Sequence, residues 1–155
     1  MRLPVFCNPS SLPLCGTLAL LAATLLMLPL SAAVAERFER YDGYEIHYNV
    51  MPTSRLQPEV ARTYGITRSR VQGLVLVSVL KDGQPVTAQV RGSARTDSGQ
   101  MRDIRFQRVE EGQAVYHLGT YRVTDQETLR FDLQVRPEMG QQSYPVQFRE
   151  RFFME

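Results

Sequence analysis

Apolar and polar residues alternate along much of the chain with a period of two, which is typical of β-strands that bury one face. The alternation is clearest over 129–136, and it also marks 44–50 and 144–153. The stretch 71–80 is instead almost continuously apolar, as in a central strand that is covered on both faces. These four segments are the firmest strand predictions.

Turn residues between the apolar runs predict how the strands connect. Asp82-Gly83 supplies the two positive-φ positions of a type I′ turn, so we expect 71–80 and 85–93 to form a hairpin. In the second arm every other residue is apolar and is expected to point inward. Those residues are Val86, Ala88 and Val90.

Two further strands are predicted between the hairpin and the last pair. The segment 102–110 places Ile104 and Phe106 on its inward side, and Glu111-Gly112 turns the chain. In 114–123 both sides carry apolar residues, so the inward side stays ambiguous. One side has Val115, Tyr121 and Val123, and the other has Tyr116 and Leu118.

The connection over 51–69 is the longest between these predicted strands, and it contains a helix signal. Residues 57–65 have a proline in the first turn and a glycine at the end, a combination that favours a brief helix. An apolar residue recurs every four positions and would form one stripe lying on the end or edge of the sandwich. The stripe consists of Leu56, Val60 and Tyr64.

About seven short strands without alternating helices predict an all-β fold. We expect an immunoglobulin-like antiparallel β-sandwich with one short helix between its first two strands. The cysteine and tryptophan core markers of antibody domains are absent, so strand number and spacing carry this prediction.

The first 35 residues differ from the rest and predict export. Arg2 is followed by an uncharged stretch over 3–35, and Ala33 and Ala35 provide the small residues that signal peptidase requires before a cut at Glu36. The prediction is therefore a cleavable Sec-type signal over 1–35 and one domain over 36–155, in the periplasm. An uncleaved stretch would instead anchor the protein in the membrane.

Composition and charge narrow the function classes. The 120 residues from Glu36 onward carry a net charge of about +1, too near neutral to predict nucleic-acid binding. Cys7 and Cys15 both precede the predicted cut, so the exported part has no thiol, disulfide or cysteine metal ligand. Sixteen of its 17 basic residues are arginine, a side chain whose planar fork pairs with carboxylates and phosphates.

Several motifs resemble a known family of small exported bacterial proteins. They are His47-Tyr48-Asn49, Pro58-Glu59-Val60-Ala61, Tyr64-Gly65-Ile66, Arg68-Ser69, Val77-Ser78-Val79-Leu80 and Glu127-Thr128-Leu129-Arg130-Phe131, together with Leu56. In this order they resemble the family catalogued as domain of unknown function 4426. The resemblance implies a periplasmic or envelope protein, and it carries over no catalytic residue.

Motifs for enzymatic chemistry are missing from the sequence. There is no G-x-S-x-G elbow, phosphate-binding glycine loop or metal-ligand spacing, so no metal or cofactor is predicted. The histidines His47 and His117 are far apart in sequence, and they could meet only across the sandwich. A small hydrolase or ligand carrier that uses either histidine is therefore the alternative to a non-catalytic binding module.

The first candidate binding site is the segment from 47 to 70. It gathers arginine, tyrosine and other polar residues that are common in interface hot spots and anion sites. The candidate residues are His47, Asn49, Arg55, Arg62, Tyr64, Arg68 and Arg70. The structural alternative is that the apolar stripe anchors this connection while the arginines keep it solvated.

A second candidate surface is the last predicted strand, where Arg149, Arg151 and Phe153 share the outward side. Such a strand is either an edge defended by charge or a site where a partner's extended segment adds a strand. The expected partner at either surface is an envelope protein or an anionic envelope ligand. Nucleic acid and membrane insertion after cleavage are not expected.

Overall fold

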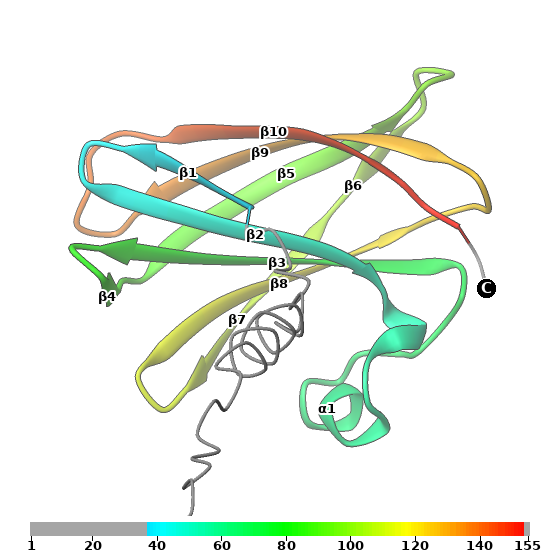
Figure 1. Ribbon diagram of the computed structural model, residues 1–155, viewed down its shortest axis with the longest axis horizontal. Coiled ribbons are helices and arrows are strands. Elements are labelled where there is room, and N and C mark those ends of the chain that lie inside the picture. The colour runs from blue at the N-terminus through cyan, green and yellow to red at the C-terminus, as the bar shows by residue number, and fades with distance from the viewer. Residues whose placement is uncertain (1–36, 154–155) are drawn as a thin grey trace, which may run out of the picture. The chain divides into compact units, whose positions relative to one another are not determined.

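The computed structural model describes residues 37–153, which fold into two antiparallel sheets packed face to face (Figure 1). The first, sheet A, has the order β1-β2-β3-β8-β7, and the two-residue β4 also pairs with β3. Its strands are β1 (Arg37–Tyr41), β2 (Tyr44–Pro52), β3 (Gln72–Lys81), β4 (Gln84–Pro85), β7 (Arg105–Glu111) and β8 (Ala114–Arg122). Sheet B has the order β10-β9-β5-β6. Its strands are β5 (Ala88–Thr96), β6 (Met101–Asp103), β9 (Thr128–Pro137) and β10 (Tyr144–Arg151).

The strand order confirms the predicted immunoglobulin-like sandwich. Taking β2 as the first strand of that fold, β2-β3-β8-β7 has the order A-B-E-D, and β10-β9-β5 has the order G-F-C. β1 is an additional strand beside β2, and β6 extends the second sheet. The predicted signal over 1–35 and its cleavage site lie outside the described residues.

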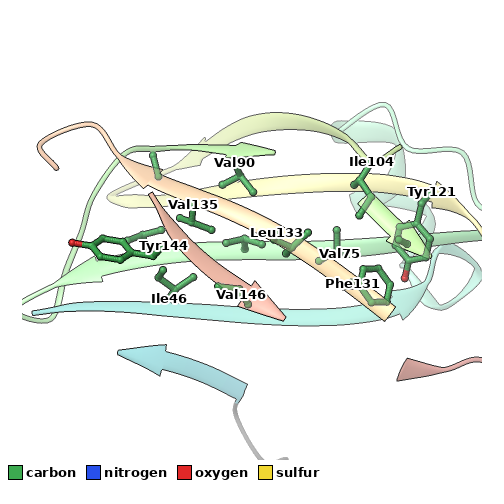
Figure 2. Close-up of a cluster of buried hydrophobic side chains, with 14 of the residues drawn as sticks. Ile46, Val75, Val90, Ile104, Tyr121, Phe131, Leu133, Val135, Tyr144 and Val146 are labelled. Carbon is green, nitrogen blue, oxygen red and sulfur yellow. The ribbon is translucent and has the colours of Figure 1, made fainter. Parts of the chain in front are cut away.

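The core fills the space between the sheets (Figure 2). β9 contributes the most regular part, because its residues alternate strictly between buried and exposed, as predicted. Phe131 is completely buried, and its ring stacks on Phe148 and meets Tyr121 edge-on. Sheet A supplies the opposing side chains. They include Ile46, Val75, Val77 and Val79.

Residues 37–153 contain ten strands where the sequence predicted about seven. β1 was missed, so the helix follows the second strand and not the first. The predicted strand 102–110 is divided because the chain changes sheets at Ile104, whose side chain is buried and whose amide donates to the carbonyl of Gly92. Residues before this point belong to β6 in sheet B, and those after it belong to β7 in sheet A.

The predicted hairpin after β3 is shorter than expected. Asp82 and Gly83 have positive φ angles of 51° and 76°, which fits the type I′ turn. Only Lys81 and Leu80 pair with β4, and the chain then crosses to sheet B as β5. Val86, Ala88 and Val90 still point toward the core, as the alternation predicted.

The connection between β2 and β3 folds over the outer face of sheet A. It contains the 3-10 turn η2 (Thr53–Arg55) and the predicted helix, α1 (Pro58–Thr63). Leu56 and Tyr64 are apolar contacts of this connection as expected, but they pack on the outer face of sheet A and not at the end or edge of the sandwich. Val60 is 39% exposed and Ala61 is buried in its place. The prediction for Val60 was wrong, because this six-residue helix turns its small Ala61 side chain inward.

A second apolar cluster lies beneath this connection. Ile66 packs there with Leu74 of β3 and Leu118 of β8. Tyr116 borders the same cluster, whereas Tyr121 of the same strand belongs to the main core. The ambiguity of 114–123 is thereby resolved: both of its faces are covered, each by a different cluster.

Candidate functional site

His47 and Asn49 lie on the outer side of β2, opposite in direction to the buried Ile46. The His47 ring lies 5.2 Å from the ring of Phe38, and its Nε2 is 3.6 Å from a carboxylate oxygen of Glu45. The side-chain oxygen of Asn49 accepts a hydrogen bond from the next backbone amide, that of Val50. Both predicted residues therefore have local contacts on the strand.

Three other residues of the first candidate site form bonds within the connection or with its neighbours. Arg62 bonds to Glu59 in its own helix, and Arg68 donates to the carbonyl oxygen of Ser54 at 2.8 Å. The hydroxyl of Tyr64 donates to Glu111 at 3.0 Å, and this bond raises the pKa of Tyr64. The Tyr64 bond ties the connection to β7 of sheet A, whereas the other two bonds lie within the connection.

Arg55 and Arg70 are exposed near the two ends of the same connection. The seven predicted residues thus extend from the outer surface of β2 over η2 and α1 to the start of β3. For Arg62, Tyr64 and Arg68 the structure identifies partners inside the chain. Binding of an external partner by this segment stays a prediction.

The two histidines lie on opposite sides of sheet A and cannot meet. His47 faces outward, whereas His117 of β8 is 3% exposed and faces the core, where its Nε2 is 2.8 Å from the carbonyl oxygen of Ala88 in sheet B. Burial lowers the pKa of His117. A neutral ring that donates to Ala88 links the two sheets.

The second candidate surface lies at the end of β10, an edge strand of sheet B. Arg149, Arg151 and Phe153 are all exposed, as predicted, and the guanidinium of Arg151 lies 5.1 Å from the centre of the Phe153 ring. Side chains of β1, which lies next to β10 in Figure 1, cover part of its open edge. Tyr41 donates to the carbonyl of Pro145, and Arg37 pairs with Glu150.

Arg149 and Arg151 are part of a larger group of arginines on the outer face of sheet B. Outward positions of β5, β9 and β10 carry six exposed arginines, which we call the arginine face. They are Arg91, Arg95, Arg130, Arg136, Arg149 and Arg151. One carboxylate, Asp132, lies among them at the outward positions of these three strands.

The register of the strands places three of the arginines in one row. Arg130 is directly opposite Arg95 of β5 and directly opposite Arg149 of β10. The next row consists of Ser93, Asp132 and Gln147. Directly opposite residues in a sheet have Cβ atoms about 5 Å apart, so the first row brings three positive charges close together.

Partners within the chain satisfy only part of this charge. Arg149 pairs with Asp97 at 2.9 Å, and Arg136 donates to the side-chain oxygen of Gln89 at 2.8 Å. For Arg91 and Arg130, no hydrogen bond or ion pair with another residue of 37–153 is found. Arg91 and Arg136 both line a small pocket of about 160 Å³.

A larger groove of about 640 Å³ lies where β6 meets the ends of β3 and β8. Its lining includes Val71 and Met101, which are both more than half exposed, together with Arg102. Arg102 is engaged already, because its two terminal nitrogens contact both carboxylate oxygens of Glu127 at 2.6 and 2.8 Å. The positive charge of Arg102 in this groove is therefore already balanced by the Glu127 carboxylate.

Metal binding has no evident place in the described part of the chain. Over residues 37–153, no three histidine, cysteine or acidic side chains are grouped so that they could hold a metal ion. Neither helix of the same region is long and apolar enough to cross a membrane.

Sequence reasoning identified the outward direction of the arginines on the predicted strands, but Arg95 lay beyond the predicted strand 85–93, and the arginine face was missed. Alternation shows that Arg130 and Arg149 point away from the core on their own strands. These two residues are opposite one another only because of the register between β9 and β10. Arg95 joins the same row because β5 pairs with β9. An excess of arginine over lysine was the only available signal.

Comparisons with known proteins agree with the motif resemblance. The family model described as "Domain of unknown function (DUF4426)" matches residues 38–155. A DUF4426 family protein from Pseudomonas aeruginosa PAO1 has a similar crystal structure, with 35% identity, a TM-score of 0.71, and coverage of 77% of this chain and 96% of that chain. The yeast GGA1 GAE domain has 6% identity and a TM-score of 0.30 over 76% of this chain and 98% of that one, too low to bear on the fold. Curated proteins gave no match. These matches show that the chain belongs to the DUF4426 family.

Proposed function

We propose that this protein is a non-catalytic binding module that holds an anionic partner on the arginine face, the outer surface of sheet B. With the predicted export signal, its place of action would be the periplasm. The proposal extends the second candidate surface from the end of β10 across the neighbouring strands β9 and β5.

The row of Arg95, Arg130 and Arg149 carries the proposal. Like charges directly opposite each other destabilise a sheet, so this row costs stability in the unbound protein. In the adjacent row Ser93 and Gln147 flank Asp132, so no like charges face each other there. An anion that bridges the guanidiniums would convert the repulsion into charge-assisted hydrogen bonds.

The positions of the histidines favour binding over hydrolysis. His117 is inside the core with Nε2 against a backbone carbonyl, and His47 is on the other side of the sheet. A general base must be within hydrogen-bond reach of the proton that it abstracts. The burial of His117 and its contact with the Ala88 carbonyl both disfavour that role, whereas the arginine face is open to solvent.

Retention on an immobilised polyanion, dextran sulfate, tests the proposal. The double variant Arg91→Glu/Arg130→Glu should elute at a much lower salt concentration than the unchanged chain, because binding of a polyanion depends on the number of contacting cations. The matched control is Arg105→Glu/Arg122→Glu, which alters charge equally at exposed strand positions of sheet A.

The same assay separates the proposal from the first candidate site. A third variant, Arg55→Glu/Arg62→Glu, makes the same charge change in the connection between β2 and β3. We expect it to elute close to the Arg105/Arg122 control. Equal retention of all three variants, or selective loss in the Arg55/Arg62 variant, would reject the arginine face as the binding surface.

A further inference from the structure

We infer that the partner of the arginine face is the phosphate-bearing surface of an anionic lipid bilayer, on which the protein rests without crossing the bilayer. This inference depends on the proposed function and names its partner. The shape of the face, the apolar residues beside it and the distribution of charge each support it.

The arginine face is an open surface of a sheet, not a groove. Its guanidiniums are spread over β5, β9 and β10, with strands about 4.8 Å apart and successive outward residues about 6.8 Å apart along each strand. Such an array presents many donors to a broad, flat anion. An extended peptide would instead add to a sheet edge, but Pro145 lacks an amide proton there and Tyr41 covers its carbonyl.

Exposed apolar side chains lie beside the arginines. Met101 is 55% exposed, and its sulfur lies 3.4 Å from a guanidinium nitrogen of Arg95. Phe153 is 57% exposed, and its ring lies under the guanidinium of Arg151. At the turn between β9 and β10, Met139 is 81% exposed.

Apolar side chains next to cations suit the boundary between lipid headgroups and acyl chains. A membrane-surface segment combines charge attraction to anionic lipids with shallow burial of apolar groups. Contact with a purely polar anion would leave Met101 and Phe153 in water. These two residues therefore favour a bilayer over a soluble polyanion.

The distribution of charge over the protein would orient it on such a surface. The outward positions of the three strands carry six arginines and Asp132, and Asp97 pairs with Arg149 at their end. Over the rest of residues 37–153, acidic and basic side chains nearly balance. A membrane with a negative surface potential would thus attract one face of a nearly neutral protein.

Flotation with lipid vesicles tests the inference. The full chain, as the producing cell delivers it, is mixed with vesicles of phosphatidylglycerol in phosphatidylcholine or with phosphatidylcholine alone. We expect binding to the anionic vesicles, a loss of more than about tenfold for Arg91→Glu/Arg130→Glu, and little change for Arg105→Glu/Arg122→Glu. All variants share residues 1–35, so any contribution of that stretch cancels in the comparison.

A second variant tests the apolar side chains. Met101→Ser/Phe153→Ser keeps every arginine, so it should retain dextran sulfate binding but bind anionic vesicles several-fold more weakly, with a steeper dependence on salt. Unchanged vesicle binding by this variant would contradict the role of these residues. Its normal retention on dextran sulfate would show that the fold and the charges are intact.

The outcomes distinguish this inference from the proposed function. Retention on dextran sulfate without binding to anionic vesicles would overturn the bilayer as partner and leave an anion-binding module with a soluble acidic partner. Displacement from vesicles by inorganic phosphate at an equal phosphate concentration would point to a site for a free anion and would also overturn it. Loss of both interactions would reject both proposals.

Discussion

The outer faces of the two sheets differ although they belong to one sandwich. The connection between β2 and β3 covers part of sheet A, where Leu74 and Leu118 are buried under Ile66. Within residues 37–153 no segment covers the outer face of sheet B, and exposed polar side chains line β5, β9 and β10. The outer face of sheet A is thus partly buried in the folded protein, whereas the outer face of sheet B is accessible to a partner.

Arginine has a different role on each face. Arg68 in the connection donates to the Ser54 carbonyl, and Arg62 pairs with Glu59. Arg130 of sheet B instead lies between two other arginines. The difference teaches that clustering of arginine along the sequence, as over 62–70, is a poorer guide to a binding surface than clustering across strands.

The largest expected effect comes from removing a side chain beneath the connection. Leu118→Ala should lower the free energy of unfolding by about 2 to 5 kcal/mol, because it leaves a cavity in the second apolar cluster. The matched change on sheet B, Gln134→Ala, alters an exposed outward residue and should stay within about 0.5 kcal/mol. Denaturant unfolding measures both, and equal effects would contradict the comparison.

The change in stability with pH should reflect the protonation of His117, which is buried on the inner side of sheet A. Burial lowers the pKa of His117, so the unfolded chain binds more protons than the folded one below about pH 6.5. The stability from His117 is complete above this pH and should decline as pH falls toward 5, by at most about 1.4 kcal/mol for each pH unit. Thermal or denaturant unfolding at several pH values measures this decline.

Variants of the two histidines identify the source of the decline. His117→Gln should remove it, while His47→Gln should keep it because His117 remains. The charged groups that act on His117 are Arg108, which lowers its pKa, and Glu138, which raises it, beside the hydrogen bond to Ala88. A decline that persists in His117→Gln would assign it to another group.

A smaller effect is expected from the arginines of the two faces. Arg68→Ala should lower stability by about 0.5 to 1.5 kcal/mol, because it removes the hydrogen bond to Ser54. Arg91→Ala, on sheet B, should leave stability nearly unchanged. If Arg91→Ala were the more destabilising variant in denaturant unfolding, the division of roles would be wrong.

The smallest expected effect has the opposite sign. Arg130→Glu should raise the free energy of unfolding by about 0.2 to 1 kcal/mol, since a carboxylate opposite Arg95 and Arg149 replaces repulsion with attraction. The gain should shrink in high salt. Arg105→Glu on sheet A, opposite Thr120, serves as the control and should show no comparable gain. A destabilised Arg130→Glu protein would indicate that Arg130 has a structural role.

Local signals predicted much of the fold. The alternation over 129–136, the Asp82-Gly83 turn and the helix over 57–65 depend on neighbours in sequence, and the structure confirms all three elements. The division of 102–110 at Ile104 could not be predicted, because the same alternation fits one strand or two strands in different sheets.

The candidate site depended on information that one sequence does not contain. Arg149 and Arg151 were recognised as outward on their strand, but the row of Arg95, Arg130 and Arg149 exists only through pairings between residues 35 and 19 positions apart. By contrast, the segment 47–70 was prominent because its residues are close in sequence. In the structure several of them bond to one another's backbone or to nearby carboxylates.

Amide chemical shifts of the isotopically labelled chain during titration with dextran sulfate test the central claim most directly. The account predicts shifts concentrated on β5, β9 and β10, centred on Arg130 and its neighbours across the strands, and fading as salt is raised. Shifts concentrated on η2, α1 and the residues up to Arg70, or none at low salt, would contradict it.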